Sequence, residues 1–323
     1  MKHLALTFLL AATGCIADSR IPSNVPVPSD YMRDIRVTNG TVVPKGGAPF
    51  LVKLLLKRNG GYGLCGGTII DPTTIITAGH CVFISSDSIV SPSGAYVYYG
   101  SESSSNTDYV QATQITLHES YDSRRIKNDI AILRIPPLTL VPGKVESISF
   151  YDDKVVPKQA LQIYGWGNTR TGGGSNSNPP SLLTQTVYIS QPKDCQVIEP
   201  SYVSADGPQI CVDSHYSIGV DVCQGDSGTG ATIINNGTQY YSGLVSYGTN
   251  ARGESTCGED GSFGMYTNVY YYKSWIESVT GNKYPAGPPN DASNAAPVPT
   301  VVASPVATPT KPPRTCYFFI FCF

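Results

Sequence analysis

Short runs of apolar and β-branched residues recur along the chain from Val37 to about Tyr284, and turn-forming stretches separate them. Typical runs are PFLVKLLL, GGTII, TIITA, GAYVYYG, DIAILRI, LQIYGW, QTVYIS and YYSGLVSYG. Such runs indicate strands, and many short strands in succession are typical of barrels and sandwiches. The pattern therefore predicts an all-β fold.

One segment near the end of this region has a helical period instead. Its apolar residues recur at the spacing of one helix face, and the segment lies between an asparagine and a glycine, which are favoured cap residues. We expect a scaffold helix here. Its apolar positions are Val269, Tyr272, Trp275, Ile276 and Val279, with Asn268 and Gly281 as caps.

The N-terminus differs from the globular region. Residues 1–17 contain Lys2, an apolar run from Leu4 to Ala12 and the small residue Ala17, which together predict a secretory signal peptide. A lipoprotein signal at Cys15 is an alternative interpretation, whereas the apolar run is too short for a membrane anchor. Residues 18–36 are polar, contain three prolines and end at Arg36.

Residues 285–323 form the expected C-terminal tail. Up to Arg314 the tail is rich in Pro, Ala, Val, Ser and Thr, a composition typical of an extended linker that can carry O-linked glycans. The chain then ends CYFFIFCF, a run too short for a transmembrane helix or a lipid-anchor signal. Cys316 and Cys322 either close a small loop or belong to a contact patch, and the sequence does not choose between them.

Charge and cysteine content narrow the environment. The net charge is -2 and only 14% of residues are charged, which argues against a nucleic-acid partner. Secretion would make most of the nine cysteines disulfide candidates, and zinc is the weaker interpretation because no central pair has C-x-x-C spacing. We expect no cofactor and no required metal. Sequons at Asn39 and Asn236 are glycosylation candidates.

Three residues could act together in nucleophilic catalysis. His80, in TIITAGHC, follows an apolar strand, and a neutral imidazole can accept a hydroxyl proton near neutral pH. Asp129, in KNDIAILRI, precedes an apolar strand, where a partly buried carboxylate can hold the histidine tautomer. Ser227, in GDSG, lies in a glycine-flanked turn that could direct the amides of Gly225 and Ser227 at one point, as an oxyanion hole. Alone, a histidine or a turn aspartate is more often structural, and GDSG is only moderately specific.

Taken together, the order His80, Asp129, Ser227 and the surrounding motifs resemble the trypsin/chymotrypsin family of serine proteases. The resemblance covers Val37 to about Gly281, and it includes VTNGT, CGGTII, TAGHC, NDIAIL, YGWGNT, CQGDSG, VSYG and MYTNV. It implies two antiparallel Greek-key β-barrels with a C-terminal helix, and a peptidase domain at residues 37–284. It also implies that the histidine and the aspartate come from the first barrel and the serine from the second.

The resemblance implies activation by proteolysis, with residues 18–36 as the activation propeptide, and a specificity pocket. Cleavage after Arg36 would free Val37, whose charged amine would pair with Asp226. Asp221, six residues before the serine, would lie at the pocket floor and attract Arg or Lys side chains. The glycines that would line the pocket walls are Gly248 and Gly264.

The resemblance also implies three disulfides among the six central cysteines, whose pairing the sequence alone does not decide. They are Cys65–Cys81, Cys195–Cys211 and Cys223–Cys257.

Some positions depart from the family pattern. Gly79 replaces the usual alanine, Thr229-Gly230 replaces Gly-Pro, Tyr247 replaces a common tryptophan, and Phe263 replaces a frequent proline. The stretch from Gly248 to Cys257 is also longer than usual.

The combined evidence predicts a secreted, extracellular serine endopeptidase that cleaves after Arg or Lys. We expect it to act as a monomer on protein or peptide substrates and to be bound by protease inhibitors. We expect no nucleic-acid partner and no membrane span. One alternative is a catalytically inactive relative that serves as a binding protein. The other places the main function in an adhesive tail.

Overall fold

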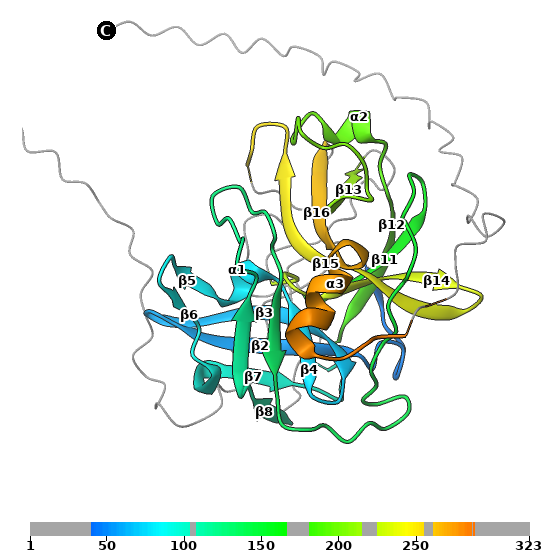
Figure 1. Ribbon diagram of the computed structural model, residues 1–323. Helices are drawn as coiled ribbons and strands as arrows, with labels where there is room; N and C mark the ends of the chain where they lie inside the picture. The colour runs from blue at the N-terminus through cyan, green and yellow to red at the C-terminus, as the bar shows by residue number, and fades with distance from the viewer. Residues whose placement is uncertain are drawn as a thin grey trace, which may run out of the picture.

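The computed structural model describes residues 40–103, 108–166, 181–214, 225–254, 261–285 and 287. Within these residues, two seven-stranded antiparallel sheets each curl into a half-barrel (Figure 1). A small hairpin of β5 (Phe83–Ser85) and β6 (Ser88–Ile89) extends from the first half-barrel. The all-β fold with a C-terminal helix is therefore confirmed.

The first half-barrel is formed by strands from the N-terminal half of the chain, in the order β8-β7-β2-β3-β4-β10-β9. Consecutive strands β2, β3 and β4 pair as hairpins, and β10 then returns to lie beside β4. The strands are β2 (Leu51–Arg58), β3 (Gly61–Asp71), β4 (Thr74–Thr77), β7 (Ala95–Tyr98), β8 (Tyr109–Gln111), β9 (Gln114–Leu117) and β10 (Ala131–Arg134).

The second half-barrel has the order β1-β12-β11-β14-β15-β16-β13. The short strand β1 comes from the start of the chain and pairs with β12, so the segment that precedes the first half-barrel is attached to the second. The strands are β1 (Thr41–Val42), β11 (Ala160–Gly165), β12 (Leu183–Tyr188), β13 (Gln209–Asp213), β14 (Gly230–Asn235), β15 (Thr238–Asn250) and β16 (Ser262–Asn268).

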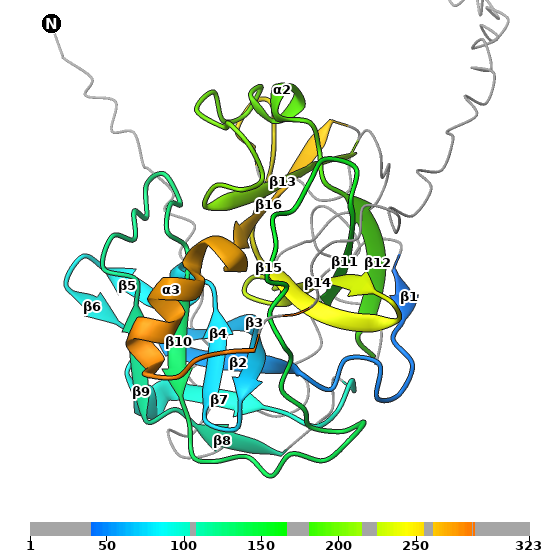
Figure 2. The ribbon, with the colours of Figure 1, turned by 45° about the vertical axis from the view of Figure 1, so that its right-hand side comes forward.

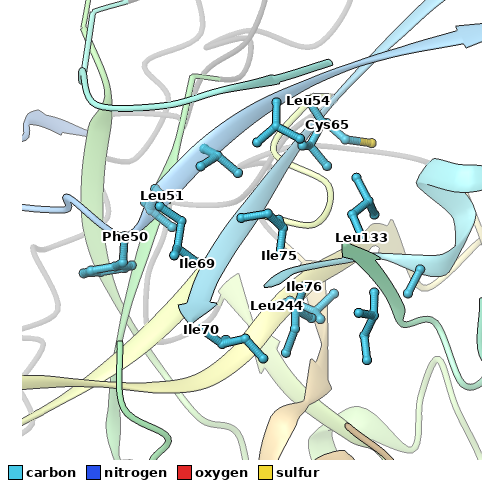
Figure 3. Close-up of a cluster of buried hydrophobic side chains, with 14 of the residues drawn as sticks. Phe50, Leu51, Leu54, Cys65, Ile69, Ile70, Ile75, Ile76, Leu133 and Leu244 are labelled. Atoms are coloured by element: carbon cyan, nitrogen blue, oxygen red, sulfur yellow. The ribbon is translucent and has the colours of Figure 1, made fainter. Parts of the chain in front are cut away.

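Aliphatic side chains from β2, β3, β4 and β10 fill the first half-barrel, and Figure 3 shows Ile75, Ile76 and Leu133 within this cluster. Leu244 on β15 lies among them, although β15 belongs to the second half-barrel. Each such side chain contributes about 1.5–3 kcal/mol when it is fully buried. The shared layer therefore holds the two half-barrels in a defined relative position.

The predicted helix is α3 (Val269–Thr280). The Asn268 side chain accepts hydrogen bonds from the Tyr270 and Tyr271 amides, and Gly281 ends the helix with a left-handed φ of 73°. Figure 2 shows α3 beside β9 and β10, where the Trp275 ring lies 4.8 Å from that of His118. The helix follows a strand of the second half-barrel and packs on the first, so it ties the two together.

Among the described residues, the other helices are single turns: α1 (Gly79–Val82), α2 (Pro192–Cys195) and the 3₁₀ turn η2 (Pro92–Gly94). Because α1 follows β4 directly, His80 lies at the end of a first-barrel strand. In the part of the chain that the structure describes, none of the helices has the length and apolar character needed to cross a bilayer.

Candidate active site

His80 is held in the turn α1 at the end of the buried strand β4. Arg58, at the end of β2, donates from Nη2 to the carbonyl oxygens of His80 (2.6 Å) and Cys81 (2.5 Å). These bonds satisfy two acceptors that a single helical turn cannot pair internally. The preceding Gly79 packs closely against its surroundings: a Cβ there would lie 3.1 Å from the Ile130 nitrogen. This tight contact explains why glycine stands where the family usually has alanine.

Asp129 lies just before β10 and is almost completely buried, with 2% of its surface exposed. Its Oδ2 accepts from His80 Nδ1 at 2.9 Å, and its Oδ1 accepts from the His80 backbone amide at 2.7 Å. The Ser246 hydroxyl donates to Oδ2 at 2.5 Å, and the Thr267 hydroxyl donates to the Asp129 carbonyl at 2.8 Å. Three donors to the carboxylate therefore define its orientation.

Opposing effects set the charge state of Asp129. Burial by itself raises the carboxyl pKa, whereas the charge of His80 and the hydrogen bonds from His80 and Ser246 lower it. The lowering effects dominate, so the pKa lies below its usual value and Asp129 is ionised at neutral pH. An ionised Asp129 requires Nδ1 of His80 to carry a proton, which leaves Nε2 free to accept another.

The loop before Asp129 is held by α3 and by the second half-barrel. Its residues Ile126 and Asn128 have left-handed φ angles of 50° and 52°, a conformation that costs energy for non-glycine residues. The Asn128 side chain accepts from the Tyr272 hydroxyl of α3 at 2.8 Å. Between these two residues, Lys127 Nζ donates to Glu199 Oε2 and to Gln209 Oε1 of the second half-barrel, both at 2.6 Å.

Ser227 lies in a tight turn that leads into β14. Gly225 and Gly228 have left-handed φ angles of 94° and 80°, which favour glycine. The Ser227 carbonyl accepts from the Gly66 amide of the first half-barrel at 2.7 Å, and the Gly228 amide donates to the Val245 carbonyl at 2.8 Å. The serine is therefore anchored by backbone contacts to both half-barrels, while its own side chain is only half-buried.

His80 and Ser227 both contact the sulfur atom of Cys81. Sγ of Cys81 lies 3.8 Å from His80 Nε2 and 3.7 Å from the Ser227 carbonyl oxygen. Among the described residues, the Ser227 hydroxyl makes no hydrogen bond to the His80 ring. Such contacts are often loose in a protease without substrate and tighten when substrate binds.

Comparison with known proteins agrees with this geometry. The family model described as Trypsin matches residues 37–276, most of the chain. The chain belongs to the trypsin family. It is 28% identical to Serine protease 1 of Homo sapiens over 276 residues, which cover 85% of this chain and 96% of that protein. It is also 28% identical to Trypsin I-P1 of Gallus gallus, covering 86% of this chain and 98% of that protein.

Membership of the trypsin family makes the chain a serine-type endopeptidase that acts on protein substrates. Transmembrane protease serine 11G of Rattus norvegicus is 24% identical, and the match covers 86% of this chain but only 64% of that protein.

The two glycines expected at the walls of the protease's specificity pocket lie opposite one another. Gly248 on β15 and Gly264 on β16 are paired residues of the antiparallel ladder. The pairing shifts register between Val245 and Tyr247, and this bulge contains Ser246, the donor to Asp129. The expected pocket floor, Asp221, lies outside the described residues.

Asp226, the expected activation partner, is completely buried. A Cβ at Gly165 of β11 would lie 1.8 Å from Asp226 Oδ1, so the carboxylate packs directly on the backbone of that glycine. Arg36, Val37 and the sequon residue Asn39 lie outside the described residues.

The unusual Thr229-Gly230 pair has a packing explanation. Thr229 is fully buried, and its hydroxyl occupies the space where a side chain at Gly66 would lie. A Cβ at Gly230 would lie 2.4 Å from Thr68 Oγ1, so β14 approaches β3 too closely for a larger residue. The strand that leaves Ser227 is therefore fitted to the surface of the first half-barrel.

Two of the three expected disulfides are present. Cys65 bonds to Cys81 beside His80, and Cys195 bonds to Cys211 in the second half-barrel. Cys223 and Cys257 lie outside the described residues. Ligand atoms of Cys65, His80 and Cys81 lie within 4.8 Å of one another, but the sulfurs are bonded to each other and offer no thiolate to a metal.

Several residues that support the site were not found from the sequence. Ser246 lies within the quoted motif VSYG, yet nothing in that motif says that its hydroxyl reaches a residue 117 positions earlier. The contacts of Lys127 with Glu199 and Gln209 carry no motif at all. Only a structure can reveal bonds between such distant positions.

Proposed function

We propose that this protease is a secreted, trypsin-like enzyme that is activated by cleavage after Arg36 and hydrolyses peptide bonds after Arg or Lys. In this proposal His80, Asp129 and Ser227 form the catalytic triad. The observation that carries it is the pairing of the half-buried His80 with the buried Asp129, held at two atoms of the carboxylate and adjacent to the glycine turn of Ser227.

The proposed chemistry proceeds through an acyl-enzyme. Ser227 Oγ attacks the scissile carbonyl carbon while His80 Nε2 takes the hydroxyl proton, and Asp129 stabilises the imidazolium that forms. The C–N bond then breaks as Nε2 gives that proton to the leaving amine. Water, deprotonated by the same nitrogen, releases the acyl group and restores the serine.

The amides of Gly225 and Ser227 are the proposed oxyanion hole. Within the part of the chain that the structure describes, neither amide donates a hydrogen bond to another residue, so both are available to a developing negative charge. Preorganised donors of this kind typically contribute roughly 10²–10³ in turnover each.

The proposed preference for Arg or Lys rests on Asp221 and on the glycine pair. A carboxylate in a narrow slot attracts a cationic side chain, and Gly248 opposite Gly264 leaves room for a long one. The longer stretch between Gly248 and Cys257 would border the pocket entrance and adjust this preference.

The proposed activation uses a buried ion pair. A new amino terminus at Val37 would be charged near neutral pH and would pair with Asp226, which lies in the interior against Gly165. Residues 1–17 would be removed on secretion, residues 18–36 on activation, and residues 37–284 would form the peptidase domain.

The proposed secretion agrees with the two disulfides and with the position of one sequon. Asn236 lies in the exposed Asn-Gly turn between β14 and β15, where a glycan would point into solvent. We also propose that the mature protease is a monomer and that residues 285–323 form a linker and tail.

The decisive experiment is a substrate assay on the secreted, activated protein. Matched amide substrates with Arg, Lys, Phe or Ala before the scissile bond are compared, with Ser227→Ala as the control. We expect Ser227-dependent turnover of the Arg and Lys substrates, and a secreted but inactive Arg36→Gln variant. Turnover of Phe alone would contradict the role of Asp221, and no turnover of any substrate would favour a binding protein.

A further inference from the structure

A polar cavity lies in the first half-barrel next to the catalytic histidine. Its volume is about 700 Å³, within the range of ligand-binding pockets. The end of β2, the β5–β6 hairpin, and β7 with β8 surround it. Figure 1 shows β5 and β6 beside α1, the turn that contains His80.

The charged residues that line this cavity are all positive. Lys57 and Arg58 line it, and no carboxylate is among its lining residues, all of which the structure describes. Lys57 is exposed and forms no ion pair with any described residue. A positive cavity without an internal counter-charge favours a negatively charged occupant.

The walls of the cavity are held in place without that occupant. Gln111 donates to the Ser93 carbonyl at 2.9 Å, and the rings of Tyr96 and Tyr109 meet at 5.5 Å in an edge-to-face arrangement. The polar and aromatic side chains of these walls can pack along the backbone of a bound peptide, while Lys57 contacts one of the peptide's side chains. Binding would require little ordering of the protein, which favours affinity.

Arg58 connects the cavity to the catalytic centre. Arg58 is a lining residue of the cavity, and its guanidinium donates to the carbonyls of His80 and Cys81. The proposed mechanism has His80 deliver a proton to the leaving amine, so the chain that follows the scissile bond lies on the histidine side. The pocket for the residue before the bond, at Gly248 and Gly264, belongs to the other half-barrel.

We propose that this cavity binds an acidic side chain of the substrate, located within a few residues after the scissile bond. This inference rests on the proposed function and adds a second specificity requirement to it. Lys57 supplies the direct contact, and Arg58 remains bonded to the histidine turn and adds its charge. The preferred substrates are then peptides with Arg or Lys before the bond and Asp or Glu shortly after it.

The test uses internally quenched peptides that are identical up to the scissile bond. Each of the first three positions after the bond is varied among Asp, Glu, Ala and Lys, and kcat/KM is measured with the activated full-length protein. We expect an acidic residue to raise kcat/KM roughly three- to fivefold over alanine at one of these positions, as for a partly exposed ion pair. High salt should reduce this ratio.

Two charge-reversed variants decide whether the cavity is responsible. Lys57→Glu should abolish or invert the acidic preference, whereas Lys193→Glu, an exposed change on α2 in the second half-barrel, should leave it intact. An equal loss in both variants would overturn the inference, as would equal rates for acidic and alanine peptides in the unmodified protease. If no peptide is cleaved in a Ser227-dependent manner, the proposed function itself fails instead.

Discussion

At the residue scale, the site depends on one carboxylate with an unusually complete set of donors. Asp129 accepts from two atoms of His80 and from the Ser246 hydroxyl, and almost none of it contacts solvent. A buried charge without such partners would cost several kcal/mol. These bonds keep Asp129 ionised and also orient the imidazole, so under the proposed mechanism stability and catalysis depend on the same contacts.

Replacing this carboxylate should remove most activity and change the acid stability. Asp129→Asn should lower kcat by about 10⁴-fold, because an amide favours the wrong histidine tautomer. A pKa lowered in the folded state stabilises the protein above the unfolded value, near ~4, and this stability is lost as pH falls through the folded pKa.

The measurements are kinetics at neutral pH and urea unfolding between about pH 2 and pH 7. The unfolding is done in a Ser227→Ala background to prevent self-digestion. The free energy of unfolding should fall less steeply below about pH 4 when Asp129 is replaced. An unchanged pH dependence would show that the pair does not contribute to acid stability.

The packing around Gly230 gives a second prediction at this scale. Gly230→Ala should lower the free energy of unfolding by about 2 kcal/mol, because its Cβ would press on Thr68 Oγ1. Adding Thr68→Ala removes the obstacle and should restore part of the loss. Urea unfolding of the two single variants and the double variant checks this, and additive losses would contradict it.

At the element scale, the loop before β10 shows how two half-barrels produce one site. The loop contains two residues in left-handed conformations, and it is held by a hydroxyl of α3 and by the side chains of Glu199 and Gln209. Such backbone strain persists only where surrounding contacts enforce it. The contacts of Lys127 therefore fix where Asp129 enters the site.

Removing the lysine should harm turnover more than substrate binding. Lys127→Met breaks the bonds to Glu199 and Gln209 and should reduce kcat roughly three- to tenfold with a smaller change in KM, because the Asp129–His80 pair loses its alignment. Lys193→Met, a lysine of α2, is the control. A change in KM alone would indicate a role in substrate binding instead.

At the scale of the whole molecule, the two half-barrels meet through a layer that also contains a buried cation. Lys53 of β2 is only 3% exposed, and its Nζ donates to the Ser103 carbonyl at 2.8 Å and lies 5.7 Å from the centre of the Trp166 ring. Burial lowers the pKa of Lys53 to about 8. Lys53 therefore binds its proton less tightly in the folded protein than in the unfolded chain.

This shift predicts a gain of stability in mild alkali. Because the folded pKa lies below the unfolded value, stability should rise between about pH 8 and pH 9.5, by an amount on the order of 1–2 kcal/mol. Urea unfolding at several pH values, in the Ser227→Ala background, measures it. The rise should disappear in Lys53→Met, and a rise of the same size in that variant would assign the effect to other groups.

Much of the architecture follows from local patterns in the sequence. Apolar residues recur at the spacing of a strand or of a helix wherever one face of the element is buried, so these elements can be predicted locally. Helix α3, for example, has the expected caps Asn268 and Gly281. His80, Asp129 and Ser227 were singled out because each lies in a local motif, and two of the disulfides match the pairing that the family resemblance implied.

The tertiary structure alone decided what lies between those motifs. Ser246 and Thr267 reach Asp129, Lys127 bonds across to the second half-barrel, and Arg58 joins His80 to a basic cavity. The packing of Gly230 on Thr68 belongs to the same group. These contacts join residues far apart in the chain, and their energies depend on distances of a few ångströms, which no local pattern of residues encodes.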